Sequence, residues 1–191
     1  MTTAEIQRMQ TRLGVPADGF WGPVSQGALR TRLRNLMPAQ NPWPRSDRAS
    51  LEAFYGKPGD ESNLVSITPP FQMLYDGKRI TSLRCHKKVA GSLHRILSRI
   101  GHYYGGRPDI LEEAQDYGGC FNFRNKRGGS SLSVHAWGAA IDLDADDNTF
   151  RDHWPMQADM PLEIIEEFAK EGWLSAAAFW GYDAMHFQAT Q

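Results

Sequence analysis

The sequence predicts an α+β fold, in which helices surround a small antiparallel sheet and a small helical module precedes them. Apolar residues recur at helical spacing in residues 1–38 and 84–104, whereas residues 139–144 and 184–188 alternate between apolar and polar side chains, as half-buried strands do. The chain has 191 residues, of which 41% are hydrophobic and 23% charged. This composition is typical of a globular protein and excludes a disordered or fibrous chain.

Residues 1–38 are expected to form the helical module. Thr2 and Glu5 have the spacing of a capping box at the start of a first helix, and Gly14 suits its end. Pro23 suits the first turn of a second helix. Two helices this short bury little surface on their own, so they need a neighbouring element to pack against.

Residues 39–48 are rich in proline and form the expected linker, and residues 49–191 form the expected main domain. Short strands are predicted at residues 64–67 and 72–74. The dipeptide Asp76-Gly77 then predicts a hairpin turn.

The longest helix is expected over residues 84–104. Residues 105–131 are rich in Gly, Arg and Asn, which indicates an irregular region around a site. A later helix is predicted to be capped by Asp159, to open at Pro161 and to end near Lys170.

Charged residues are segregated along the chain, although the net charge is only -1. Residues 78–107 contain eight basic residues and no acidic one, whereas residues 142–171 contain ten acidic and two basic residues. This pattern is consistent with two oppositely charged solvated faces or with a polar site where the two stretches meet. The near-zero total argues against bulk electrostatic binding to nucleic acid or to an anionic membrane.

The N-terminal sequence shows neither the apolar run nor the cleavage pattern of a signal peptide, so synthesis in the cytoplasm without an export signal is expected. The longest mostly apolar stretch near the end, residues 173–180, is too short to span a bilayer. Cys85 and Cys120 are too few for a disulfide scaffold; they are either reduced core residues or one optional bridge.

Two histidines and one aspartate are the candidate metal ligands. His135 precedes the predicted strand that carries Asp142, and His186 lies on the last predicted strand. Zinc accepts these residue types, and three protein ligands leave a fourth position open, as in catalytic zinc sites. Alternation turns Asp142 and His186 toward a cavity. It turns four neighbours toward the core: Ile141, Leu143, Met185 and Phe187.

Asp183 lies three residues before His186, where it can sit beside a metal without binding it. From there it could take a proton from an attacking water and pass it to a leaving amine. On spacing alone, a turn residue that caps the strand is an equal alternative. The helical motif His-Glu-x-x-His is absent, which excludes that class of zinc enzyme.

The motif Ser133-x-His135, with Asp142 after it and Asp183-x-x-His186 far downstream, resembles the LAS group of zinc peptidases. This group includes the D-alanyl-D-alanine carboxypeptidases and the L-alanyl-D-glutamate endopeptidases of phage lysins, and the hedgehog signalling domain is a relative. The resemblance covers about residues 45–191. It implies that His135, Asp142 and His186 bind Zn²⁺ and that Asp183 is the general base.

The resemblance also implies that an arginine upstream of His135 contacts the substrate. Arg124 matches that position best, and Arg127 is either a second substrate contact or a surface residue. A guanidinium there can stabilise negative charge on the scissile carbonyl oxygen or clamp a substrate carboxylate. Ser133 is expected to fix the loop of His135 or to bind substrate. Trp180 and Tyr182 either line a substrate groove or pack in the core.

The stretch Asp18-Gly19-x-Trp21-Gly22-Pro23 is similar to the Asp-Gly-x-Phe-Gly-Pro core of helical peptidoglycan-binding modules, over residues 3–37. The resemblance implies a module that binds glycan or that only packs on the peptidase domain.

Together these features predict a zinc-dependent peptidase that cleaves peptidoglycan stem peptides. We expect a monomeric phage endolysin of the L-alanyl-D-glutamate endopeptidase type, made in the host cytoplasm and acting on the cell wall after release. A D-alanyl-D-alanine carboxypeptidase of wall maintenance and a non-catalytic, zinc-stabilised wall-binding protein are the alternatives. No nucleic-acid or membrane partner is expected.

Overall fold

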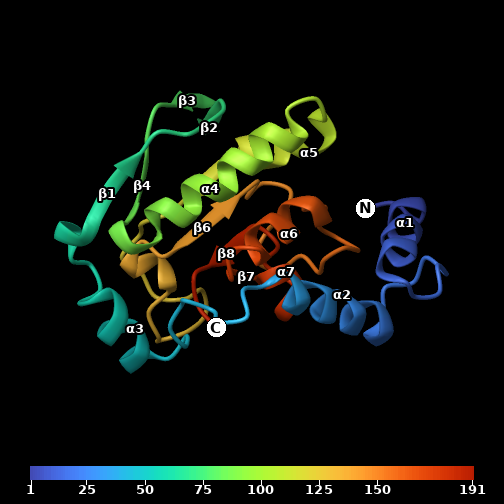
Figure 1. Ribbon diagram of the computed structural model, residues 1–191, viewed down its shortest axis with the longest axis horizontal. Helices are drawn as coiled ribbons and strands as arrows, with labels where there is room; N and C mark the ends of the chain where they lie inside the picture. Colours follow the sequence, from blue (N-terminus) through green and yellow to red (C-terminus); the bar gives the residue numbers. More distant parts are fainter.

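The computed structural model describes residues 1–191 and confirms the predicted α+β class (Figure 1). The helices are α1 (Thr3–Leu13), α2 (Pro23–Leu36), α3 (Arg48–Tyr55), α4 (Lys87–Tyr104), α5 (Pro108–Gln115), α6 (Leu162–Ala169) and α7 (Ala176–Phe179), with short 3-10 turns η1 (Glu61–Asn63) and η2 (Val134–Trp137). The strands are β1 (Leu64–Ile67), β2 (Met73–Tyr75), β3 (Lys78–Ile80), β4 (Leu83–His86), β5 (Tyr117–Gly119), β6 (Ala140–Leu143), β7 (Leu174–Ser175) and β8 (His186–Gln188). No helix combines the length and apolar character that crossing a membrane requires.

The central sheet is antiparallel, with the strand order β5-β6-β8-β7. Neighbouring strands β6 and β8 are in a register that places Asp142 opposite His186. Helix α6 packs against β7, and the ring of Phe168 stacks on Phe187 of β8 with 4.0 Å between centroids. The pairing of β6 with β8 therefore joins two distant parts of the chain within the core.

The predicted long helix buries most of its apolar stripe, with Tyr104 at its end half-buried, but it begins later than predicted. Residues 83–86 are strand β4, which pairs with β1. His86 then caps α4, because its Nδ1 accepts a hydrogen bond from the backbone N–H of Lys88. The predicted hairpin is confirmed: β2 and β3 are joined through Asp76 and Gly77, with φ of 50° and 69°, as a tight two-residue hairpin turn needs.

Two other expectations are wrong. Residues 105–131 are not irregular throughout, since they contain α5 and β5. Asp159 does not cap the following helix. The residue before α6 is Pro161, whereas the Asp159 carboxylate accepts a hydrogen bond from Asn148 at 3.1 Å. The carboxylate of Asp159, which was predicted to cap the helix, is thus bound by the buried amide of Asn148 instead.

The helical module, residues 1–38, packs against α6 and α7 at the right of Figure 1. The predicted capping box of Thr2 and Glu5 is present, and Gly14 ends α1 in the left-handed conformation. Arg12 of α1 and Arg32 of α2 both form ion pairs with the buried carboxylate of Glu166 on α6. This packing supplies the neighbouring surface that two short helices require.

The proline-rich segment at residues 39–48 packs against residues 171–172, which follow α6. The indole N–H of Trp43, which is 6% exposed, donates to the carbonyl oxygen of Glu171 at 2.7 Å. The side-chain amide of Asn41 donates to the carbonyl oxygen of Gly172 at 2.9 Å. The position of the module is therefore fixed by its connection as well as by its own contacts.

The segregated charges meet at the interface of α4 with α6 rather than at a polar site. Arg99 of α4 lies 2.8 Å from the carboxylate of Glu167 and 2.9 Å from that of Glu171, and Arg95 also pairs with Glu171. Two residues of each stretch thus link α4 to α6 and to the residues just after it. Cys85 and Cys120 are both buried with free thiols.

Candidate active site

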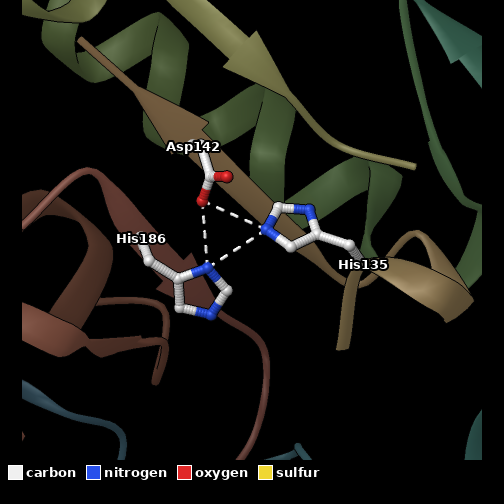
Figure 2. A group of neighbouring side chains, drawn as sticks. All are labelled: His135, Asp142 and His186. Atoms are coloured by element: carbon white, nitrogen blue, oxygen red, sulfur yellow. Dashed lines mark hydrogen bonds and ion pairs between the residues drawn. The ribbon is translucent and has the colours of Figure 1, made fainter. Parts of the chain in front are cut away.

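His135, Asp142 and His186 converge as predicted (Figure 2). His135 Nε2 lies 3.1 Å from Asp142 Oδ1 and 3.1 Å from His186 Nδ1, and His186 Nδ1 lies 3.0 Å from the same carboxylate oxygen. The three side chains come from η2, β6 and β8. Three ligand atoms are therefore gathered at one point by segments up to 51 positions apart.

The far nitrogen of each imidazole is held by a neighbouring oxygen. His135 Nδ1 donates to the carbonyl oxygen of Cys120 at 2.8 Å, and His186 Nε2 donates to Gln188 Oε1 at 3.1 Å. The Gln188 amide is itself oriented, because its Nε2 donates to Thr190 Oγ1 at 2.6 Å. In neutral imidazoles these contacts leave the lone pairs of His135 Nε2 and His186 Nδ1 facing each other and the carboxylate.

When both imidazoles are neutral, these three atoms are all acceptors, and a bound cation would satisfy them. Two imidazole nitrogens and one carboxylate oxygen, with the outer ring nitrogens hydrogen-bonded, form the donor set that zinc favours, so the residues present fit that metal. Burial raises the pKa of Asp142, but the positive charge of His135 and His186 when they are protonated, together with the hydrogen bonds they then donate, more than offsets it and holds the pKa well below its usual range. Asp142 is thus a carboxylate at neutral pH.

The loop of His135 is fixed by its neighbours. Ser133 caps η2 by accepting a hydrogen bond from the N–H of His135, which is the structural role predicted for it, and it also lines the cavity described below. Gly138 ends η2 with φ of 67°, and a Cβ there would lie 2.7 Å from Leu64 Cδ2 and 3.0 Å from the backbone nitrogen of His86. Only glycine lets the turn lie this close to β4.

Asp183 lines a cavity of about 390 Å³ together with Asp142 and His186. It adopts the left-handed conformation with φ of 58°, and its carbonyl oxygen accepts a hydrogen bond from the N–H of His186 at 2.9 Å. Burial raises the pKa of its carboxyl, against the opposing effect of His186. Asp183 is thus a turn residue that also lines the site.

Basic residues occupy the same cavity. Arg124 Nη2 lies 4.0 Å from the outer oxygen of Asp142, and Arg127 lines the cavity beside it. Lys126 also lines it, a residue that the sequence analysis passed over although it stands between the two arginines. The cavity is thus suited to negatively charged groups.

Aromatic side chains form the opposite wall. The ring of Trp180 stacks on His186 with 5.8 Å between centroids, and Tyr182 packs edge-on against Phe150. Both predicted aromatics are about two-fifths exposed, at 41% and 38%, so they line the cavity and do not belong to the core. Met185 is buried as predicted, with 3% exposure, and it also contributes to the cavity wall just before β8 begins at His186.

A second cavity, of about 420 Å³, borders the same group of residues. Tyr75, Tyr117 and His135 line it, and it shares Asp142, Arg124 and Arg127 with the first. The ligand atoms therefore stand between two cavities instead of at the closed end of one.

The sequence analysis also missed Gln188 and Cys120. Gln188 could have been found, because a residue two positions after His186 on a strand shares its face. The contact of Cys120 uses a backbone carbonyl, for which the residue type carries no signal.

A separate group of carboxylates lies beyond the end of β6. Oxygens of Glu113, Asp144 and Asp159 lie within 4.8 Å of one another, and Asn148 donates to both aspartates. Burial and the neighbouring carboxylate of Asp144 raise the pKa of Glu113 to about 9, from an ordinary value of 4.5. The folded protein therefore keeps a proton on Glu113 that the unfolded chain loses above pH 4.5.

Glu113→Gln is expected to raise the melting temperature at pH 8.5 and to change it little at pH 5. Because the folded state binds more protons than the unfolded state between the two pKa values, stability conferred by the parent residue falls as the pH rises through this range. Thermal unfolding at both pH values measures the effect, with Glu112→Gln, an exposed neighbour, as the control. Equal shifts at the two pH values would contradict the assignment.

A family model described as D-alanyl-D-alanine carboxypeptidase matches residues 127–189. The matched segment contains His135, Asp142, Asp183 and His186, which confirms the resemblance to this peptidase family over these residues. The match begins after the helical module and so does not test the resemblance of that module to peptidoglycan-binding modules. No curated protein and no solved structure shows a significant match.

Proposed function

We propose, from the match of residues 127–189 to a peptidase family model, that the chain is a zinc-dependent peptidase that cleaves peptidoglycan stem peptides, as an endopeptidase of the L-alanyl-D-glutamate type. The observation that carries the proposal is the convergence of two imidazole nitrogens and one carboxylate oxygen, from His135, His186 and Asp142, within 3.1 Å of one another in a site that Asp183 also lines.

His135, Asp142 and His186 would hold the zinc ion through the atoms that converge in Figure 2. Zinc bound there acts as a Lewis acid toward the scissile carbonyl group and the attacking water. The hydrogen bonds from His135 to Cys120 and from His186 to Gln188 keep both rings in the orientation and tautomer that binding requires.

Asp183 is proposed as the general base. Its carboxyl faces the cavity that contains the ligands, and its raised pKa moves it toward the range in which a carboxyl both accepts and returns a proton near neutral pH. In the proposed reaction it accepts the proton of the attacking water and passes it to the nitrogen of the leaving amine. Arg124 stabilises the negative charge that develops on the carbonyl oxygen.

The two cavities favour an endopeptidase. A carboxypeptidase needs room for one residue beyond the scissile bond, whereas an endopeptidase binds chain on both sides of it. Here the ligands stand between cavities of about 390 and 420 Å³, each large enough for several atoms of a peptide. Arg124, Lys126 and Arg127 also suit a substrate with free carboxylates, as stem peptides have.

Purified protein is expected to release stem peptides from peptidoglycan by cutting within the peptide. Mass spectrometry of the soluble products identifies the bond: internal cleavage exposes a new amino terminus on a multi-residue fragment. Release of free D-alanine alone would instead assign the carboxypeptidase activity after which the family is named. Zinc binding without any product would favour the non-catalytic wall-binding protein.

The endolysin role extends this proposal. We propose that the protein is made in a host cytoplasm, is released to the wall as a monomer, and contacts peptidoglycan also through the helical module. The support for this part is the resemblance of residues 3–37 to wall-binding modules and the basic cavity.

A further inference from the structure

The helical module is joined to the active site through the short helix α7. This helix ends at Phe179, and the next four residues, Trp180 to Asp183, carry the stacked aromatic ring and the proposed base. Because the last carbonyl groups of a helix have no partner within it, the end of α7 depends on outside donors.

Side chains of α2 supply these donors. Arg30 Nε donates to the carbonyl oxygen of Ala178 at 3.0 Å, and Arg30 Nη2 donates to that of Phe179 at 2.9 Å. Gln26 Nε2 donates to the carbonyl oxygens of Ala177 and Ala178. Every carbonyl of the last three residues of α7 is thus capped by the module, while that of Ala176 accepts from Trp180 and Gly181.

Arg30 has no ion-pair partner. No carboxylate oxygen lies within 4.0 Å of its guanidinium, and its side chain donates only to the two carbonyl oxygens. A guanidinium fork offers two donors in a fixed geometry and a positive charge, both of which suit the negative end of a helix. An arginine at position 30 is therefore well suited to cap the end of α7.

A second contact holds the same loop from its other side. The ring of Trp21 packs edge-on against Trp154, with 5.1 Å between centroids. The backbone N–H of Trp154 donates to the carbonyl oxygen of Gly181 at 3.1 Å, and His153 forms a β-bridge with Tyr182. The indole N–H of Trp21 also donates to Gln26 Oε1 at 2.7 Å, which links the two contacts.

We propose that Arg30, supported by Gln26 and Trp21, is a positioning residue for the loop Trp180–Asp183, so that the helical module is a structural part of the active site. This inference rests on the proposed function for its effect on turnover. Loss of the cap frees the end of α7, the loop moves, and Asp183 and Trp180 leave their places in the cavity. A displacement of this kind is known to slow catalysis without removing any catalytic group.

The test compares Arg30→Met with Arg32→Met, which loses its ion pair with Glu166 but leaves α7 capped. Arg30→Met is expected to lower kcat on peptidoglycan fragments about 10-fold, since small displacements at a reacting centre have effects of this order or larger. In Arg30→Met, the backbone amides of Trp180 and Gly181, which both donate hydrogen bonds to the carbonyl oxygen of Ala176, should exchange hydrogen faster than in the parent. Arg32→Met should keep kcat and exchange near the parent values, and Arg30→Lys should restore part of kcat.

The same kcat and exchange rates in Arg30→Met as in Arg32→Met would overturn the proposal. If Arg30→Met does not fold, Gln26→Leu tests the same cap, with the same expected and contradicting results. Should the parent protein hydrolyse no peptidoglycan, the proposed function fails, and the exchange rates of Trp180 and Gly181 alone decide the positioning role.

Discussion

Asp183→Asn is expected to lower peptidoglycan hydrolysis by about 10²- to 10⁴-fold, which is the contribution that a positioned general base makes. An amide keeps the size and polarity of the carboxyl but cannot accept the proton of the attacking water. Asparagine also tolerates the left-handed conformation that Asp183 adopts at φ of 58°, so the turn before β8 is preserved.

Turnover of soluble fragments measures this loss, while metal content and melting temperature show that the fold and the ligands are intact. Asp76→Asn is a matched control, because Asp76 is an exposed aspartate with φ of 50° in the hairpin turn and lines neither of the two cavities. Activity of Asp183→Asn within about threefold of the parent value would assign the proton transfer to another group, because loss of a general base costs far more than this.

His186→Ala is expected to abolish both zinc binding and hydrolysis. The parent protein should bind one zinc ion, and at a concentration about 1,000 times Kd the ion should stabilise the fold by about 4 kcal/mol. For a chain of this size that gain corresponds to an increase of about 8 to 16 °C in melting temperature. The variant retains two ligands, so zinc should not shift its melting temperature in this way.

Thermal unfolding with and without zinc, together with elemental analysis, measures both effects. His94→Ala is the control, since His94 is an exposed histidine on α4 and takes no part in the ligand group. A zinc-dependent shift in His186→Ala equal to that of the parent would show that the metal binds elsewhere.

The meeting of Asp142 with His186 could be predicted because strand alternation is a local property. Asp142 and His186 face the same way on strands whose polar and apolar residues alternate, and the register of β6 with β8 then brings them together. Met185 is buried as the same rule predicts, but it precedes β8 and also lines the cavity, which alternation alone does not indicate.

Long-range contacts between unlike elements could not be predicted from the sequence. Arg30 reads as an ordinary surface residue of a short helix, and its two carbonyl partners lie 148 and 149 positions away. The start of α4 was misplaced for a similar reason, since pairing with β1 holds residues 83–86 extended in a stretch that is compatible with helix. Local helix propensity predicts the start of a helix correctly only where no distant strand pairs with the same residues.

The buried carboxylate of Glu166 limits how this protein can exchange its parts during evolution. Its side chain is 6% exposed and is neutralised by Arg12 and Arg32, which both come from the first 38 residues. An unpaired charge at that depth is strongly destabilising. A recombination event that joined a different N-terminal segment to residues 49–191 would have to bring two suitably placed cations with it, or lose Glu166 at the same time. We therefore expect the two parts to be inherited together.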